Sequence, residues 1–302
     1  MGDAVDDRIN TDDTDPDPED SLPRMTLSEH LDELRRRVVR SALALVLGMV
    51  VAFCFYKNLL HFVTEPYRQA SLGSGGSVSE QLQSISPLDG FVSAMKLAFL
   101  TGLVATGPYV LAQMWGFVSA GLYPHEKKAV RVFFPVSVSL FALGCVTAYV
   151  MILPIGLQFL MIFSHSADLT THYGISDYLS LVLSLVFGMG IAFQMPLLIL
   201  FLEATGIVER ATFAKNWRIA VLSAFVVTMI VTPDPTPVSQ IIMAIPLIGL
   251  YFLGVWGGRF VGEDRERFTW WKAWPLLLTL LLIFVILFFG RDFGNAAASL
   301  FK

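Results

Sequence analysis

Charged side chains are scarce in this chain of 302 residues. They make up 15% of the sequence, against roughly 25% in ordinary soluble domains, and hydrophobic residues make up 55%. Several uninterrupted apolar runs approach the ~20 residues that a helix needs to cross a bilayer. These proportions exclude a single soluble domain, and they predict an all-α polytopic membrane protein.

Cysteine is also rare, with two residues in the whole sequence. Cys54 and Cys145 both fall inside apolar runs, where we interpret them as small core residues. Their spacing predicts neither a disulfide framework nor a metal site. We therefore expect no metal and no cofactor.

Ionisable residues are missing from the middle of the apolar runs, where Gln194 is the main polar residue. A secondary transporter of a small solute or ion needs such residues, and it usually has two related halves with broken helices. No such repeat is evident. An intramembrane enzyme would need a His/Asp/Glu cluster or a Ser–His pairing inside the runs. The transporter is therefore the alternative to a binding or scaffold function, and the enzyme is the weakest hypothesis.

Basic residues are nearly absent from positions 1–23, which hold nine carboxylates and only Arg8. The formal charge of this stretch is −8, so the remainder carries +4 of the total of −4. Such a composition does not fold alone, and we predict a disordered, solvated cytoplasmic tail over residues 1–25. A cleaved signal peptide would begin with a basic region, so we expect the first membrane helix to be retained.

The apolar runs define the predicted spans, and clusters of Lys and Arg at alternate loops place the N-terminus in the cytoplasm. The fifth run has 14 residues. At ~1.5 Å per residue it reaches only ~21 Å of a ~30 Å hydrocarbon core. The predicted spans are residues 41–58, 88–122, 126–163, 178–202, 219–232, 238–256 and 274–289.

Residues 26–39 precede the first span. Thr26 and Glu29 form a capping-box pattern, and apolar residues then recur at helical spacing. We expect a short amphipathic helix that lies along the membrane surface and runs into the first span. Glu33 and Arg37 share one face of this helix, and such a pair contributes only ~0.3–0.5 kcal/mol.

Two further expectations concern the outer side. Residues 58–87 are predicted to form a loop of about 30 residues, which is long by the usual standard for loops. Asp89 and Lys96 lie in the first turns of the second span, and we interpret them as a surface ion pair.

Residues 117–128 join the second and third spans, so they must lie near a membrane surface. The segment contains an aromatic ring, Phe117, and a lone carboxylate, Glu126. Together they could bind a cationic, partly apolar peptide. The alternative is a solvated loop whose Lys127 and Lys128 merely follow the positive-inside rule.

Five motifs carry a resemblance to a known family. They are His30 to Arg37, Glu65-Pro66, Phe117 to Lys128, Phe193 to Pro196, and Ser239-Gln240 ahead of Ala244-Ile245-Pro246. Through them, residues 26–262 resemble the TatC subunit of the twin-arginine protein translocase. The resemblance implies a six-helix concave bundle shaped like a cupped hand, without enzymatic chemistry. Residues 263–302 lie beyond it.

The resemblance also implies a function and a site. Family members recognise the paired arginines in the signal peptides of folded cargo and assemble with TatA- and TatB-like single-span partners and with further copies of themselves. Transport is driven by the protonmotive force, and no nucleic acid is involved. The matching positions are Glu33, Phe117 and Glu126 for the signal-peptide site; Leu34, Arg35, Arg37 and Pro66 for assembly or function; Gln194 for the concave face; and Asp234 for the acidic tip of a hairpin, where the spacing differs by a residue.

Physical chemistry agrees with this site. An arginine guanidinium offers a planar fork of donors that a carboxylate accepts bidentately, which lysine does not reproduce. Glu33 and Glu126 could hold two consecutive arginines, and Phe117 could pack against the apolar residues that follow. The amide of Gln194 needs a partner inside the membrane. That partner is either another helix of the chain or a docking subunit, and the sequence leaves both open.

The last apolar run, residues 274–289, is slightly short for a span. If it crosses the membrane, the C-terminus lies outside; if it lies at the interface, the C-terminus stays inside. We favour a crossing, which adds a C-terminal membrane helix to the bundle. The expected location is the cell (inner) membrane.

Overall fold

The structure is a computed structural model that describes residues 27–73, 82–122, 127–166, 173–204, 208, 210–231 and 237–261. Nearly all of these residues are helical, which confirms the all-α fold. The acidic tail and the run at 274–289 lie outside the described residues. The elements are α1 (Leu27–Cys54), α2 (Tyr56–Gly73), α3 (Asp89–Ala120), α4 (Lys127–Thr147), the π-helical turn η1 (Ala148–Ile152), α5 (Leu153–Ser166), α6 (Ile175–Ala192), α7 (Met195–Ala204), α8 (Arg210–Lys215), α9 (Trp217–Val231) and α10 (Pro237–Val261).

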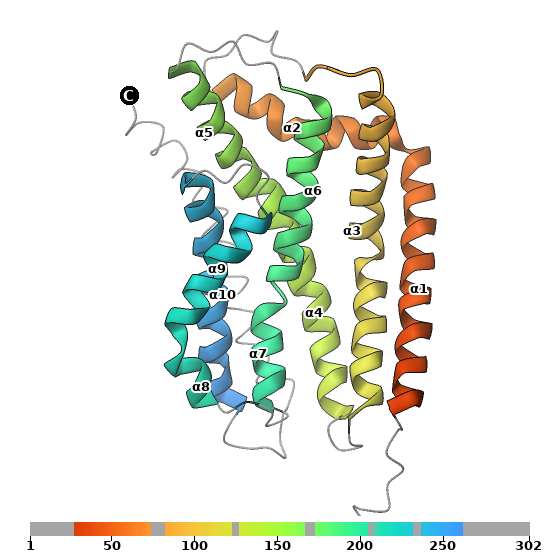
Figure 1. The fold of residues 1–302 in the computed structure, drawn as a ribbon, viewed down its shortest axis with the longest axis vertical. Coiled ribbons are helices and arrows are strands. Elements are labelled where there is room, and N and C mark those ends of the chain that lie inside the picture. Colours follow the sequence, from red (N-terminus) through yellow and green to blue (C-terminus); the bar gives the residue numbers. More distant parts are fainter. Residues whose placement is uncertain are drawn as a thin grey trace, which may run out of the picture.

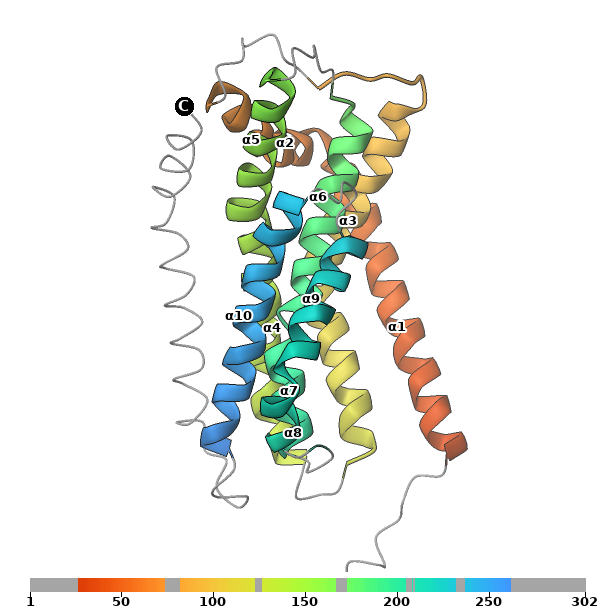
Figure 2. The same ribbon diagram turned by 60° about the vertical axis from the view of Figure 1, so that its left-hand side comes forward.

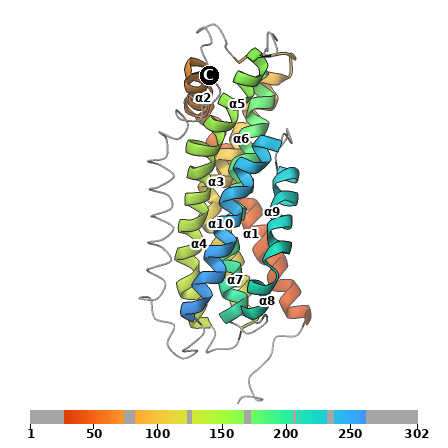
Figure 3. The same cartoon turned by 90° about the vertical axis from the view of Figure 1, so that its left-hand side faces the viewer.

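The long helices α1, α3, α4 and α6 lie side by side along the length of the molecule (Figure 1). We call the end at which α1 begins and α3 ends the proximal end, and the opposite end, across which α2 runs, the distal end (Figures 1 and 2). α1 packs mainly on α3, and α3 also contacts α4 and α6. α10 packs against α7 and α9, and Figure 3 shows α9 running along it.

Six apolar helical segments correspond to the first six predicted spans. Four of them are long and apolar enough to cross a membrane, and the two in α9 and α10 are shorter. The chain is therefore a multi-pass membrane protein. The segments are Ser28–Cys54, Asp89–Ala120, Phe133–Phe163, Ile175–Glu203, Trp217–Met229 and Met243–Trp256.

The predicted helix over residues 26–39 continues into the first span as expected, but its predicted orientation along the membrane surface is wrong. α1 runs without a break from Leu27 to Cys54, so the amphipathic segment and the first span form one helix of 28 residues. Within α1, no Gly or Pro occurs before Gly48, and the Arg and Leu residues of this stretch are good helix formers. At ~1.5 Å per residue this helix is about 42 Å long, so its first turns extend beyond a ~30 Å hydrocarbon core.

The predicted loop at residues 58–87 is wrong over its first half, because residues 56–73 form α2. Apolar side chains at helical spacing bury one face of this helix, as Val63, Tyr67 and Ala70 show. Pro66 lies inside the helix. The same spacing is visible in the sequence, and it outweighs the proline that suggested a loop.

The core lies where α4, η1 and α5 meet α6. Leu140, Leu153, Leu179 and Met189 are almost completely buried there. A Cβ placed on Gly144 of α4 would lie 2.6 Å from the backbone oxygen of Met189, so the two helices approach closely. This rigid centre holds the proximal and distal ends in place.

Candidate functional site

α1 and α3 pack closely along their length, and their proximal ends form the candidate site. In the distal half of α1, a Cβ on Gly48 would lie 2.8 Å from Cγ2 of Thr106, and a Cβ on Gly102 would lie 2.8 Å from the backbone nitrogen of Met49. Glycines of this kind let membrane helices approach until their backbones almost touch. From this contact the two helices continue side by side to their proximal ends, and we call their junction there the proximal seam.

Glu33 and Arg37 form the charged part of the proximal seam. Nε and Nη2 of Arg37 lie 2.7 and 2.6 Å from Oε1 of Glu33, and both side chains are about one-fifth exposed. The predicted i,i+4 ion pair is confirmed. The guanidinium lies directly over Gly116 of α3, where any Cβ would overlap Nη1 of Arg37. Gly116 thus provides the space in which Arg37 reaches Glu33.

Phe117 forms the aromatic part of the proximal seam. Its ring stacks on that of His30, with 4.3 Å between the centroids and 24° between the planes. His30, Glu33 and Arg37 are spaced i, i+3 and i+7, so they follow one face of α1. Phe117, the ring that the sequence singled out, therefore lies beside the helix of Glu33, the carboxylate that the resemblance implied, at one end of the molecule.

This arrangement can bind a cation that carries apolar groups. A partly exposed carboxylate accepts hydrogen bonds from a guanidinium, and a half-buried ring beside it offers apolar contact. The ion pair with Arg37 fixes the carboxylate, and the stack with His30 fixes the ring. Among the residues that the structure describes, no group of three His, Cys, Asp or Glu side chains could hold a metal ion.

A family model for the Sec-independent protein translocase protein TatC matches residues 29–246. The chain belongs to the TatC family. The TatC of Aquifex aeolicus is 35% identical over 244 residues, which cover 80% of this chain and 98% of that protein. The TatC of Koribacter versatilis is 33% identical over 249 residues, with coverage of 82% and 90%.

Solved structures agree with this assignment. A crystal structure described as the twin-arginine translocase receptor TatC superposes with a TM-score of 0.69 and 32% identity. The match covers 78% of this chain and 100% of that one. The protein is thus a translocase subunit of the TatC family, a transport component and not an enzyme, as the resemblance implied.

Apart from Gln194 and Pro66, the TatC-like positions noted in the sequence fall into three groups. Glu33, Arg37 and Phe117 meet at the proximal seam. Leu34 and Arg35 are exposed on α1. Glu126 and Asp234 lie outside the described residues, so their predicted roles remain predictions.

Gln194 lies in the turn between α6 and α7, and its partner is a serine on α4. Oγ of Ser137 donates to Oε1 of Gln194 at 2.7 Å, and Nε2 of Gln194 donates to the carbonyl of Ser137 at 3.0 Å. Ser137 is fully buried. Of the two open alternatives, the structure shows the intramolecular one, because another helix of the same chain already pairs with the amide.

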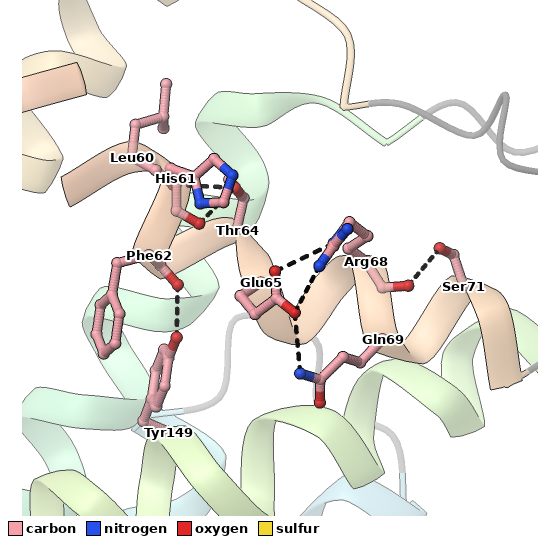
Figure 4. Close-up of polar contacts among 9 residues, drawn as sticks. All are labelled: Leu60, His61, Phe62, Thr64, Glu65, Arg68, Gln69, Ser71 and Tyr149. Atoms are coloured by element: carbon pink, nitrogen blue, oxygen red, sulfur yellow. Dashed lines mark hydrogen bonds and ion pairs between the residues drawn. The ribbon is translucent and has the colours of Figure 1, made fainter. Parts of the chain in front are cut away.

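Pro66 acquires a physical role at the distal end of this TatC protein. Proline has no N–H, so the carbonyl of Phe62, four residues earlier, lacks its helical donor. The hydroxyl of Tyr149 donates to that carbonyl at 2.5 Å (Figure 4). The hydroxyl of Tyr178 donates to the next carbonyl, that of Val63, at 2.6 Å. Two tyrosines from other helices thus tie α2 to the bundle.

Glu65 and Arg68 form an exposed ion pair on the outer face of α2 (Figure 4). Oε1 of Glu65 accepts from Nη2 of Arg68 at 2.9 Å and from Nε2 of Gln69 at 3.0 Å. The hydrogen bonds from Arg68 and then from Gln69 hold the pKa of the Glu65 carboxyl below its ordinary value. This pair belongs to the solvent face of α2.

The predicted ion pair between Asp89 and Lys96 is wrong. Oδ2 of Asp89 accepts the backbone N–H groups of Ile85 and Ser86, both at 2.7 Å, just before α3 begins. Nζ of Lys96 instead bridges to α6. It donates to the carbonyl and Oγ of Ser176 at 3.0 and 2.7 Å, and to Oγ of Ser180 at 2.7 Å. All three ammonium hydrogens have an acceptor, so Lys96 ties α3 to α6.

Sequence reasoning missed the residues that support the site rather than those that form it. His30 and Gly116 act across the proximal seam. Nothing in the local sequence indicates that His30 stacks on Phe117 or that Gly116 makes room for Arg37. Tyr149 and Tyr178 act on carbonyls, which leave no trace in a sequence. The one available signal was Pro66, whose missing N–H predicts an unpaired carbonyl at Phe62.

Proposed function

We propose that this protein is the receptor and scaffold subunit of a twin-arginine translocase and that the proximal seam binds the paired arginines of cargo signal peptides. The observation that carries the proposal is the adjacency of Glu33 on α1 and Phe117 on α3, joined by the stack between His30 and Phe117. The crystal structure that this fold resembles is described as a twin-arginine translocase receptor.

The recognition step uses two carboxylates and a ring. Glu33 accepts one guanidinium of the peptide, Glu126 accepts the other, and Phe117 packs against the apolar residues that follow. Arg37 already bonds to Oε1 of Glu33, so an incoming arginine shares that carboxylate or displaces Arg37. Each exposed ion pair contributes only ~0–1 kcal/mol, and the affinity in detergent is accordingly modest.

Assembly uses the apolar surface that the fold leaves uncovered. Leu43, Leu47 and Val50 on α1 are each more than half exposed, because α1 contacts the bundle mainly through α3. Such faces meet lipid, TatA- and TatB-like single-span helices, or another copy of the chain. The arginines of α1 lie at the proximal end and support a cytoplasmic position for that end, with the protein in the inner membrane of the cell. Transport then draws on the protonmotive force.

Peptide binding to the purified protein tests the proposal. A fluorescent peptide with consecutive arginines is titrated in detergent alongside the same peptide with two lysines. We expect the Arg-Arg peptide to bind more tightly, and Phe117→Ala, Glu126→Ala and Glu33→Gln each to weaken it. Equal binding of both peptides, unaffected by these substitutions in folded protein, would refute the receptor function of the proximal seam.

A further inference from the structure

His30 lies between α1 and the end of α3, and its environment is specific. One face of its ring stacks on Phe117. Its Cε1 lies 3.3 Å from the point where a Cβ on Gly121 would stand, so the glycine leaves just enough room for the imidazole. Its Nδ1 is buried and has no hydrogen-bond partner among the described residues.

We propose that His30 is a positioning residue for peptide recognition, which acts by holding the ring of Phe117 in one orientation. The inference rests on the proposed function and adds to it a residue that the sequence motifs did not assign to the site. His30 itself does not contact the paired arginines. Its contribution is made through the stacked ring.

The contact between His30 and Phe117 indicates which property of His30 matters. The side chain of Phe117 has no N–H or O–H donor and no oxygen or nitrogen acceptor, so His30 orients it through the ring stack. The stack is therefore the functional contact, and the imidazole serves as a flat ring of the right size. Phenylalanine should replace it, and alanine should not.

The benefit to binding is pre-organisation. A Phe117 ring that is free to rotate must be immobilised when the peptide arrives, and that ordering lowers affinity. A ring already stacked on His30 avoids this loss. The space above Gly121 matters for the same reason, since a larger residue there would push His30 away from Phe117.

A double-mutant cycle tests the inference. We expect His30→Ala to weaken binding of the Arg-Arg peptide by about threefold to tenfold, and His30→Phe to restore it. In the Phe117→Ala background His30→Ala should have no further effect, because the ring it positions is gone. His61→Ala on α2 is the matched control, since His61 is exposed at the distal end, and it should leave binding unchanged.

A spectroscopic measurement on the peptide-free protein provides a second readout. With 4-fluorophenylalanine at position 117, the ¹⁹F resonance should shift when His30 is replaced by alanine and return towards its original position with His30→Phe. An unchanged resonance, or His30→Ala effects that persist without the Phe117 ring, would overturn the inference.

Failure of the inference and failure of the proposed function give different results. If wild-type protein prefers the Arg-Arg peptide through Phe117 and Glu126 while His30→Ala binds as tightly, only the positioning role is refuted. If the wild-type protein does not distinguish Arg-Arg from Lys-Lys, the receptor function fails, and the role of His30 fails with it.

Discussion

The two ends of this TatC protein are held together in different ways. At the distal end, the hydroxyls of Tyr149 and Tyr178 and the ammonium group of Lys96 donate hydrogen bonds across helices, and most of their acceptors are backbone carbonyls or serines. At the proximal seam, the contacts are a ring stack and an ion pair within α1.

This difference suits the two ends to different tasks. Cross-helix bonds to backbone carbonyls depend little on neighbouring side chains and fix the helices to one another. A stack and a part-exposed ion pair leave the carboxylate of Glu33 and the ring of Phe117 within reach of another molecule. We therefore interpret the distal end as the structural end and the proximal end as the binding end.

Loss of Lys96 should have the largest effect on stability. Lys96→Met removes three hydrogen bonds from a charged donor and leaves Ser176 and Ser180 without it, so we expect about 2–3 kcal/mol of destabilisation. Thermal unfolding in detergent measures it. Lys57→Met, at an exposed lysine, is the control. A Lys96→Met protein that is fully stable but defective in peptide binding would reverse the roles assigned to the two ends.

Loss of single tyrosine hydroxyls should have the next largest effect. Tyr178→Phe removes a buried hydrogen bond to the carbonyl of Val63, which costs about 1 kcal/mol, and Tyr149→Phe should cost less because Tyr149 is partly exposed. The free energy of unfolding is compared with that of Tyr109→Phe, at an exposed tyrosine on α3. If Tyr178→Phe is no worse than this control, the tyrosines do not hold α2 in place.

Gly116→Ala should separate binding from stability at the proximal seam. A methyl group there displaces the guanidinium of Arg37, and a long side chain can move at little cost. We expect stability to change by less than about 1 kcal/mol, and Arg-Arg peptide binding to fall by about twofold to fivefold because Glu33 is no longer fixed. Gly249→Ala, where a Cβ meets nothing within 4 Å, should alter neither quantity. If Gly116→Ala instead unfolds the protein, the proximal seam is needed for stability and is not a separate binding feature.

Patterns of apolar residues predicted most of the fold. The six expected spans in the described part of the chain appear, most of them with boundaries shifted by a few residues, because length and hydrophobicity determine what can cross a bilayer. The first begins at Ser28, 13 residues before its predicted start at residue 41. The errors occurred where two local signals conflicted. In α1 the amphipathic pattern of the first turns suggested a helix along the membrane surface, and in α2 Pro66 suggested a loop.

The site was predictable only in part. Phe117 stands out as a ring near a membrane surface, and Glu33 was assigned to the site through the family resemblance, while Glu126 lies outside the described residues. The residues that support them do not stand out, since the contacts of His30 and Gly116 are made between residues more than 70 positions apart in the sequence. The same holds for Lys96, whose nearest carboxylate in sequence, Asp89, instead accepts backbone N–H groups of the residues before α3.

Removal of the exposed ion pair between Glu65 and Arg68 on α2 should have the smallest effect on stability. It contrasts most sharply with removal of the tyrosine hydroxyls that bond to carbonyls of the same helix. Because the pKa of Glu65 lies below its ordinary value of 4.5, the ion pair stabilises the fold at neutral pH, and this contribution is lost as the pH falls through the folded-state pKa. Glu65→Gln should therefore lower the unfolding temperature slightly at about pH 7 and hardly at all in acid. At about pH 7, the effect should be smaller at about 1 M salt than at low salt. Arg68 is 69% exposed, so solvent screens most of the attraction. A Glu65→Gln effect as large as that of Tyr178→Phe, and insensitive to salt, would mean that the surface pair rather than the buried hydroxyls fixes α2 to the bundle.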